Sequence, residues 1–303
     1  MENTSTSSER IDALERLSDR VYEAIDQKTH GEHRYRQMLR LGMNATATML
    51  REKSMDEAGK AYVSIMQDQL RRGGMTPFDY REWTKYKAYA ETLPGAPYVR
   101  TTHFDDLAGK YADTTRATAD SEHLPESDAR HAIHLGALAV PYAMEHYPDL
   151  NPQRIAVYTL WHDMLEAYTG DIPTLGISEK LLAEKHRIEA EALLTFEKEY
   201  AQKWPQLVAM IQEYETLADD ESKFTKSIDK LDPGFTHFAN HGAQLLTHYR
   251  YQTKESFVKD IETGTNRIRS YGSSFPFVLE DREELTKRIA DHTEWPATDQ
   301  LAS

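Results

Sequence analysis

Residues 153–168, QRIAVYTLWHDMLEAY, decide the fold of this chain. Apolar side chains lie on nearly every side of the helix that this stretch predicts, and such a helix is buried at the centre of its domain. Asn151-Pro152 precedes it as a cap followed by a first-turn proline, and Gly170 is placed to end it. We therefore expect an all-α domain built around this segment.

Two polar residues, His162 and Asp163, interrupt the apolar stretch. Burying both without a partner costs several kcal/mol each, and a bound divalent cation is the simplest compensation. Glu166 projects from nearly the same face of the predicted helix. A single buried histidine is usually only hydrogen-bonded in the core. The order of His131, then His-Asp with a nearby glutamate, then Asp229 in a further helix is more specific for a metal site.

The composition limits the chemistry of such a site. The 303 residues carry 36 Lys plus Arg against 50 Asp plus Glu, a formal charge of −14. This charge argues against binding of a nucleic-acid polymer, but it allows a small anion held by a few local cations. There is no cysteine, so His, Asp and Glu must hold the metal, which suits Mn, Co, Fe, Zn or Mg.

Membrane and export signals are missing from the sequence. No apolar run approaches the roughly 20 residues of a membrane span, and the N-terminus MENTSTSSER lacks the apolar core of a signal peptide. We therefore expect no membrane partner and a cytoplasmic location.

The chain divides by its patterns into four predicted parts. Pro94-Gly95-Ala96-Pro97 is the clearest break, and no strand alternation or internal repeat is evident. Within the main domain we expect an irregular stretch to Pro125 and three further helices, at 127–146, 178–202 and about 213–231. The parts are a disordered tail (1–10), an N-terminal helical region (11–100), the main domain (101–295) and a second tail (296–303).

Four motifs resemble those of HD-domain 5'-deoxynucleotidases of the YfbR type. The His-Asp dipeptide is shared by the whole HD phosphohydrolase superfamily, whereas the glutamate three residues later and the Thr-Gly-Asp-x-Pro turn are characteristic of this branch. The resemblance covers about residues 112–250 and implies an HD-domain helical bundle with an added N-terminal helical region. The motifs are Arg130-His131, WHDMLE at 161–166, TGDIP at 169–173 and KSID at 226–229.

The resemblance assigns roles to individual residues. It implies that Glu166 is a catalytic acidic residue, which orients or deprotonates the attacking water, and that Asp171 is a second functional acidic residue. It also implies that Arg116, fifteen residues before the first ligand, binds phosphate, and it matches Glu126 to an acid of the family. The implied metal ligands are His131, His162, Asp163 and Asp229.

Two positions depart from the family pattern. Ala117 stands where the family carries a tryptophan beside the sugar, which predicts a weaker preference for deoxyribose over ribose. Arg130 stands where the family has glutamate, and it adds a cation that could serve extra phosphates. Lys226 is a further candidate for a substrate contact.

The leading prediction is a metal-dependent nucleotide phosphohydrolase that cleaves the 5'-phosphate of (deoxy)nucleoside monophosphates. One alternative is a (deoxy)nucleoside triphosphate phosphohydrolase of the same fold, and another is a catalytically silent scaffold that binds a nucleotide or a protein. A two-metal oxygenase would need extra ligands, and His186, His123 and His146 are weak candidates. His134 lies one turn after the first ligand, His131, and is a candidate to contact that ligand without binding the metal itself. A homodimer is one expected assembly.

Overall fold

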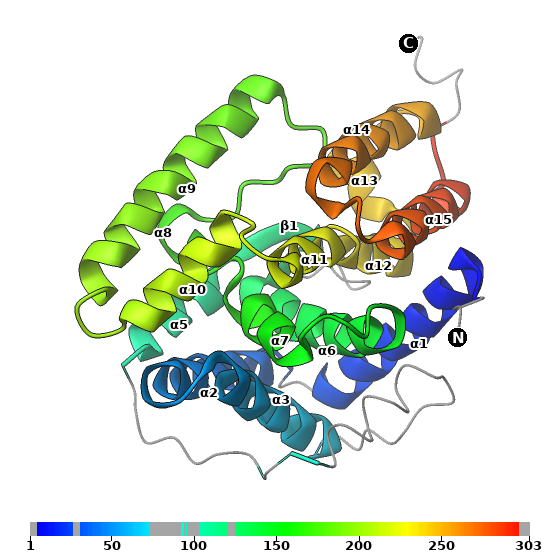
Figure 1. Cartoon of the computed structure of the whole chain (residues 1–303). Helices are drawn as coiled ribbons and strands as arrows, with labels where there is room; N and C mark the ends of the chain where they lie inside the picture. Colours follow the sequence, from blue (N-terminus) through cyan, green and yellow to red (C-terminus); the bar gives the residue numbers. More distant parts are fainter. Residues whose placement is uncertain are drawn as a thin grey trace.

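The computed structural model describes residues 5–26, 31–72, 92–93, 95, 103–119 and 125–296 of the chain, and this part is largely helical (Figure 1). None of the helices in these ranges is both long enough and apolar enough to cross a bilayer. The described elements, in chain order, are α1 (Ser7–Asp26), α2 (Gly31–Glu52), α3 (Met55–Arg72), α5 (Asp105–Asp113), β1 (Thr115–Ala119), β2 (Pro125–Ser127), α6 (Asp128–His146), α7 (Pro152–Trp161), α8 (Glu166–Thr169), α9 (Glu179–Tyr200), α10 (Pro205–Glu215), α11 (Asp220–Asp229), α12 (Asp232–Ala239), α13 (Ala243–Thr247), α14 (Lys254–Gly272) and α15 (Pro276–His292).

Helix α7 lies near the middle of the molecule and packs against α3, α6 and α11 (Figure 1). From Ile155 to the end of the helix every side chain is buried, as expected for a helix that is apolar on all sides. Asn151 begins the helix, because its side-chain oxygen accepts hydrogen bonds from the amides of Gln153 and Arg154. The predicted all-α fold centred on this segment is confirmed.

The chain leaves this helix at His162, earlier than the predicted end at residue 168. Turns follow, and then the short helix α8. The Nδ1 atom of His162 hydrogen-bonds to the carbonyl oxygen of Thr159, 2.9 Å away, which the amide of residue 163 would use in a continuous α-helix. The prediction of one unbroken helix is therefore wrong, and the His-Asp pair lies at a helix end.

The predicted helix at about 213–231 is also divided. It consists of the end of α10, a turn in which Leu217 has a φ of 52°, and α11. Asp219 starts α11 as a reciprocal cap, because its side chain accepts from the amide of Ser222. The predicted starts of α6 at Ser127 and α9 at Ser178 are confirmed by similar caps.

Helices α1, α2 and α3 share one hydrophobic core with the main domain. They pack against α6 and α7, so the N-terminal region supports the central helices directly. Of the predicted boundary at 94–97, only residue 95 belongs to the described part of the chain.

The predicted N-terminal tail is shorter than expected, because α1 begins at Ser7. Arg10 is only 2% exposed, and its guanidinium contacts Asp281 (2.8 Å) and Glu280 (2.7 Å) on α15. A buried ion pair of this kind holds the first turn of α1 on the C-terminal helix. Residues 1–4 and 297–303 lie outside the described residues.

A two-stranded antiparallel sheet occupies part of the stretch that was expected to be irregular. Strands β1 and β2 pair with Thr115 opposite Ser127 and Ala119 opposite Pro125. The strands are too short to show an alternating apolar pattern, which is why the sequence did not predict them. Strand β1 matters because it carries Arg116 and Ala117.

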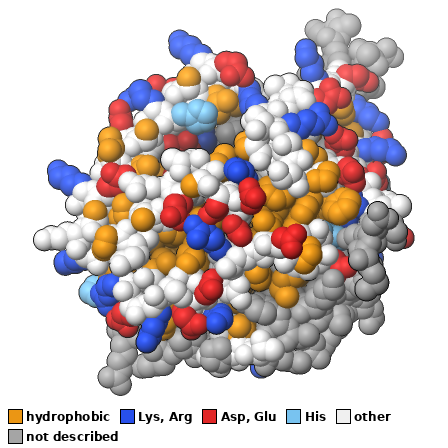
Figure 2. Space-filling view, viewed as in Figure 1, with side chains coloured by type: hydrophobic (Ala, Val, Ile, Leu, Met, Phe, Trp, Pro, Cys, Tyr) orange, Lys and Arg blue, Asp and Glu red, His pale blue; other side chains and the backbone are white. Residues whose placement is uncertain are grey.

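Helix α9 extends along the edge of the molecule, and α14 and α15 form an adjoining pair (Figure 1). Figure 2 shows acidic, basic and apolar side chains interspersed on the same face. Neither sign of charge dominates the described part of this face.

Candidate active site

The four predicted metal ligands converge at one point. Ligand atoms of His131 on α6, His162 and Asp163 after α7, and Asp229 at the end of α11 all lie within 4.8 Å of one another. The shortest distances are 2.9 Å between His162 Nε2 and Asp163 Oδ2 and 2.9 Å between His131 Nε2 and Asp229 Oδ1. Three segments that are distant in sequence therefore supply two imidazoles and two carboxylates to one centre.

The environment of His162 indicates that this centre needs a cation. Its Nδ1 atom faces the carbonyl oxygen of Thr159, which can only accept, so Nδ1 carries the proton. Its Nε2 atom is buried without a hydrogen bond among the described residues, although Asp163 Oδ2 is 2.9 Å away. A lone pair facing a carboxylate oxygen needs a positive charge between the two atoms. The four side chains thus have the donor atoms and the spacing that a divalent metal ion requires.

The pKa values of the imidazoles reflect the same need for positive charge. Burial by itself would lower the pKa of His162, but the carboxylates of Asp163 and Asp229 outweigh it and raise the pKa to about 9. Burial opposes protonation of His131 in the same way, and its hydrogen bonds to Asp229 and Asp232 raise its pKa to about 10. The carboxylates therefore stabilise a cation at this point.

Asp232 orients His131 through the ring nitrogen Nδ1, whereas Nε2 is the atom that faces the carboxylate of Asp229. Its two carboxylate oxygens accept from Nδ1 of His131 (2.8 Å) and Nδ1 of His134 (2.7 Å), and His134 Nε2 lies 3.0 Å from the hydroxyl of Ser18 on α1. A carboxylate bound to the outer nitrogen of a ligand histidine fixes the tautomer and the ring orientation. His134 therefore supports the centre through Asp232, and α1 is linked to the metal site.

Asp232 was not among the site residues predicted from the sequence. Its signal was the acid three residues after Asp229, in the continuation KLD of the fourth motif. We expect Asp232→Asn to weaken metal binding about 10- to 100-fold, because the ring of His131 loses its charged anchor. Titration calorimetry with Mn²⁺ measures this change. Ser18→Ala, at the outer end of the same chain of hydrogen bonds, is the control and should have a much smaller effect; equal affinity of Asp232→Asn and wild type would contradict the prediction.

Glu166 lines the same cavity as the ligand Asp163. It begins α8, is 6% exposed, and its Oε1 atom lies 3.5 Å from Nζ of Lys185. Its Oε2 atom has no hydrogen-bond partner among the described residues. Burial raises the pKa of this carboxyl well above its usual range, and the charges of Asp163 and Asp128 add to the effect. A bound cation acts in the opposite direction and favours the carboxylate.

Arg116 connects the sheet to the metal centre. Its NH1 atom lies 2.8 Å from Oδ2 of the ligand Asp163 and 3.4 Å from Oδ1 of Asp128, and its Nε atom is 3.9 Å from Glu126. Burial raises the pKa of Asp128 to about 8 despite the neighbouring guanidinium. The guanidinium is thus held beside a ligand carboxylate, where an anion bound to the metal would meet it.

Asp171 and Ala117 are joined by a hydrogen bond in the wall of the cavity. The Oδ2 atom of Asp171 accepts from the backbone amide of Ala117 (3.2 Å), and Gln244 donates to the carbonyl of Ala117 (3.0 Å). Both residues line the cavity. Asp171 therefore holds strand β1 in place, in addition to any contact with a substrate.

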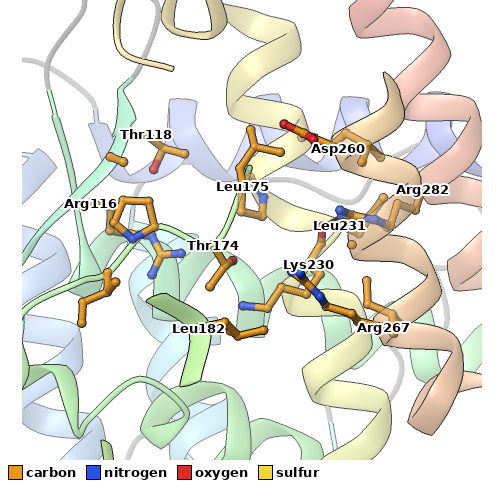
Figure 3. A pocket seen from close by; sticks show the side chains of 18 of the residues that line it. Arg116, Thr118, Thr174, Leu175, Leu182, Lys230, Leu231, Asp260, Arg267 and Arg282 are labelled. Carbon is orange, nitrogen blue, oxygen red and sulfur yellow. Dashed lines mark hydrogen bonds between the residues drawn. The ribbon is translucent and has the colours of Figure 1, made fainter. Parts of the chain in front are cut away.

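The cavity beside the metal centre has a volume of about 510 Å³. Arg116 and Thr118 lie on one side of it, and Lys230, Arg267 and Arg282 lie on the other (Figure 3). Such a space can enclose a small organic ligand. The cavity is also lined by apolar and aromatic side chains: Leu175, Leu182, Leu231, Ile261, Ile268, Tyr249, Tyr271 and Phe257.

Arg130 does not lie where a substrate contact was predicted. Its guanidinium lies over the ring of Tyr22, 4.6 Å from the centroid, and 6.0 Å from that of Tyr35. It is not among the cavity-lining residues. Because consecutive residues on a helix point about 100° apart, the neighbour of His131 faces α1 and α2 rather than the cavity. The prediction that Arg130 serves phosphates is therefore corrected.

The remaining candidates are placed as follows. Lys226 lines the cavity, with Nζ 5.3 Å from the ring centroid of Tyr214. His186 also lines the cavity but is not part of the ligand cluster. His146 packs on the ring of Tyr142, 4.4 Å away, and His123 lies outside the described residues.

The chain belongs to the HD domain family, whose sequence profile matches residues 108–269. It is similar to "5'-deoxynucleotidase hdd1" of Schizosaccharomyces pombe, with 32% identity over 147 residues, which is 46% of this chain and 66% of that protein. It is also similar to "5'-deoxynucleotidase HDDC2" of Bos taurus, with 34% identity over 114 residues, 36% of this chain and 51% of that protein. It is likewise similar to "5'-deoxynucleotidase HDDC2" of Homo sapiens, with 33% identity over 114 residues, which is 36% of this chain and 51% of that protein. The matched part thus spans about half to two thirds of these curated relatives.

Among solved structures, the chain is similar to that of a predicted metal-dependent phosphohydrolase from Magnetospirillum magnetotacticum. The TM-score is 0.49 at 21% identity, and the match covers 62% of this chain and 90% of that one.

Proposed function

We propose that this protein is a metal-dependent phosphohydrolase that cleaves the 5'-phosphate ester of a nucleotide. The observation that carries the proposal is the lone pair of His162 Nε2 facing Asp163 Oδ2, beside a cavity lined by Glu166. A nucleotide is the proposed substrate because the curated relatives are named 5'-deoxynucleotidases.

The residues divide the reaction between them. When bound, a divalent cation lowers the pKa of a coordinated water and offsets charge on a phosphoryl oxygen. Glu166, with one free carboxylate oxygen, orients the attacking water and accepts its proton. Arg116 holds the phosphate as a planar fork, and Asp171 keeps strand β1 and its arginine at the right distance.

A screen of nucleotides with Mn²⁺, Co²⁺ and Mg²⁺ tests the proposal. Release of inorganic phosphate or of an oligophosphate from a nucleotide, dependent on the metal, is the expected result. Tight nucleotide binding without any turnover would instead show a catalytically silent scaffold and overturn the proposal.

Location and assembly belong to the same proposal. We propose that the protein acts in the cytoplasm on free nucleotides rather than on a nucleic-acid polymer, because a formal charge of −14 repels a polyanion. A homodimer is proposed as well, and light scattering in solution tests it.

Ala117 provides a test of sugar selectivity. Its side chain lines the cavity next to Arg116, where the bulk of a tryptophan would narrow the space beside a bound sugar. We expect Ala117→Trp to increase the preference for deoxyribonucleotides over ribonucleotides by roughly tenfold or more, since one such contact is worth about 1–3 kcal/mol. The measurement is kcat/KM for matched ribo- and deoxynucleotide pairs. Ala201→Trp, beyond the end of α9, is the control; an unchanged ratio in Ala117→Trp would remove residue 117 from the sugar pocket.

A further inference from the structure

One side of the cavity carries positive charge that cleavage of a single phosphate does not use. Lys226 and Lys230 at the end of α11, Arg267 on α14 and Arg282 on α15 all line it. We call these four residues the basic wall. Figure 3 shows Lys230, Arg267 and Arg282 across the cavity from Arg116. The basic wall is therefore separate from the arginine that faces the metal ligands.

Arg282 is the most informative member of the basic wall. Its Nε atom donates to Thr265 (3.1 Å), and NH1 donates to the backbone carbonyl of Lys230. Among the described residues no carboxylate lies within ion-pair distance of this guanidinium. Burial lowers its pKa to about 10. The charge of Asp229 opposes this shift only in part. A partly buried cation without an ion-pair contact is costly, and an anionic ligand compensates it.

The NH2 atom of Arg282 lies next to Gly264 on α14. A Cβ atom placed on Gly264 would lie 3.5 Å from it, and both residues line the cavity. The two acids on this side are already engaged: Asp260 accepts from the hydroxyl of Tyr251 (2.8 Å), and Glu179 pairs with Arg267. They do not neutralise Arg282.

The basic wall begins next to the metal centre. Nζ of Lys230 lies 2.7 Å from Oδ2 of Asp229, whose other oxygen lies 2.9 Å from the ligand atom of His131. Lys226 lies one helical turn before Lys230, above the ring of Tyr214. An anion on the basic wall would thus be close to a phosphate bound at the metal, in the same cavity.

We propose that the basic wall is a second anion subsite, which binds a further phosphate group of the nucleotide substrate. The inference rests on the proposed function, and it makes a nucleotide with at least two phosphates the preferred substrate. The reaction itself is unchanged: the water oxygen bonds to phosphorus, the bond to O5' breaks, and O5' takes a proton. A nucleoside 5'-triphosphate then releases its whole oligophosphate, whereas a nucleoside 3',5'-bisphosphate releases inorganic phosphate.

The test compares one nucleoside as its 5'-monophosphate, 5'-triphosphate and 3',5'-bisphosphate. Wild type should show the highest kcat/KM for either the 5'-triphosphate or the 3',5'-bisphosphate. The preferred one of the two identifies where the extra phosphate is attached. Arg282→Met should raise KM for this substrate roughly 10- to 100-fold, the effect of one or two charge-assisted hydrogen bonds, and change that of the monophosphate little. Arg267→Met changes a residue near the surface, where folding tolerates substitution. It should also raise KM for this substrate and not for the monophosphate, but by a smaller factor. Arg269→Met, whose side chain pairs with Glu283 outside the cavity, is the matched control.

Two results would overturn the inference. One is a wild-type preference for the monophosphate, and the other is an equal loss for all three substrates in both Arg282→Met and Arg267→Met. If no nucleotide is hydrolysed, the proposed function fails, but the subsite is still testable. Calorimetry with inorganic tripolyphosphate and the metal-loaded protein should then show binding that Arg282→Met weakens; equal binding by the variant and wild type would reject the basic wall as an anion site.

Discussion

We expect Asp163→Ala to abolish both metal binding and phosphohydrolase activity. The carboxylate is one of four ligands, and its Oδ2 atom also lies 2.8 Å from Arg116. The variant therefore loses a proposed metal ligand together with the carboxylate that holds Arg116, the residue proposed to bind phosphate. Turnover should fall roughly a thousandfold or more, because the metal supplies several kcal/mol of transition-state stabilisation. Metal content by mass spectrometry and phosphate release from the best substrate measure the two effects.

A matched control separates this loss from a general loss of folding. Asp220→Ala removes an exposed acid on α11, the helix that carries Asp229, and breaks only a surface contact to Lys223. It should retain metal and activity. Stoichiometric metal at wild-type affinity in Asp163→Ala would contradict the assignment of the metal centre.

Glu166→Gln should retain the metal and lose most of the turnover. The substitution preserves the size of a buried side chain. It removes the carboxylate that we propose as the acceptor of a proton from water. Loss of a general base lowers kcat typically 10²- to 10⁴-fold. Single-turnover kinetics at saturating substrate, with metal content measured in the same sample, distinguish a chemical defect from a binding defect.

The control for Glu166→Gln is Glu189→Gln, because both glutamates contact Lys185. This lysine lies 3.5 Å from Glu166 and 2.8 Å from Glu189, so Glu189→Gln removes its other acidic partner. If the role of Glu166 is only to hold Lys185, both variants should lose activity to a similar extent. A large loss in Glu166→Gln alone indicates proton transfer, and an unchanged kcat in Glu166→Gln would rule it out.

The sequence by itself determined the helical class and, together with the family resemblance, predicted the four residues that cluster in the structure. Those conclusions depend on information that is local in the chain: a stretch apolar on all sides, its Asn-Pro start, and a His-Asp pair whose burial needs compensation. The cap at Asn151 could be predicted for the same reason, because a cap involves residues only two or three positions apart.

Only the tertiary structure decided what surrounds these donors. The end of α7 at His162 depends on a side-chain bond to Thr159 that competes with the backbone, which a periodic apolar pattern cannot show. The different roles of Arg130, over Tyr22, and Arg282, in the cavity, depend on which helix packs against each one. Asp232 and Ser18 lie far apart in sequence, yet both support His131 through one chain of hydrogen bonds. Local patterns specify which residue types are present and which helix they belong to, whereas contacts between distant segments are set by the packing of all the helices at once.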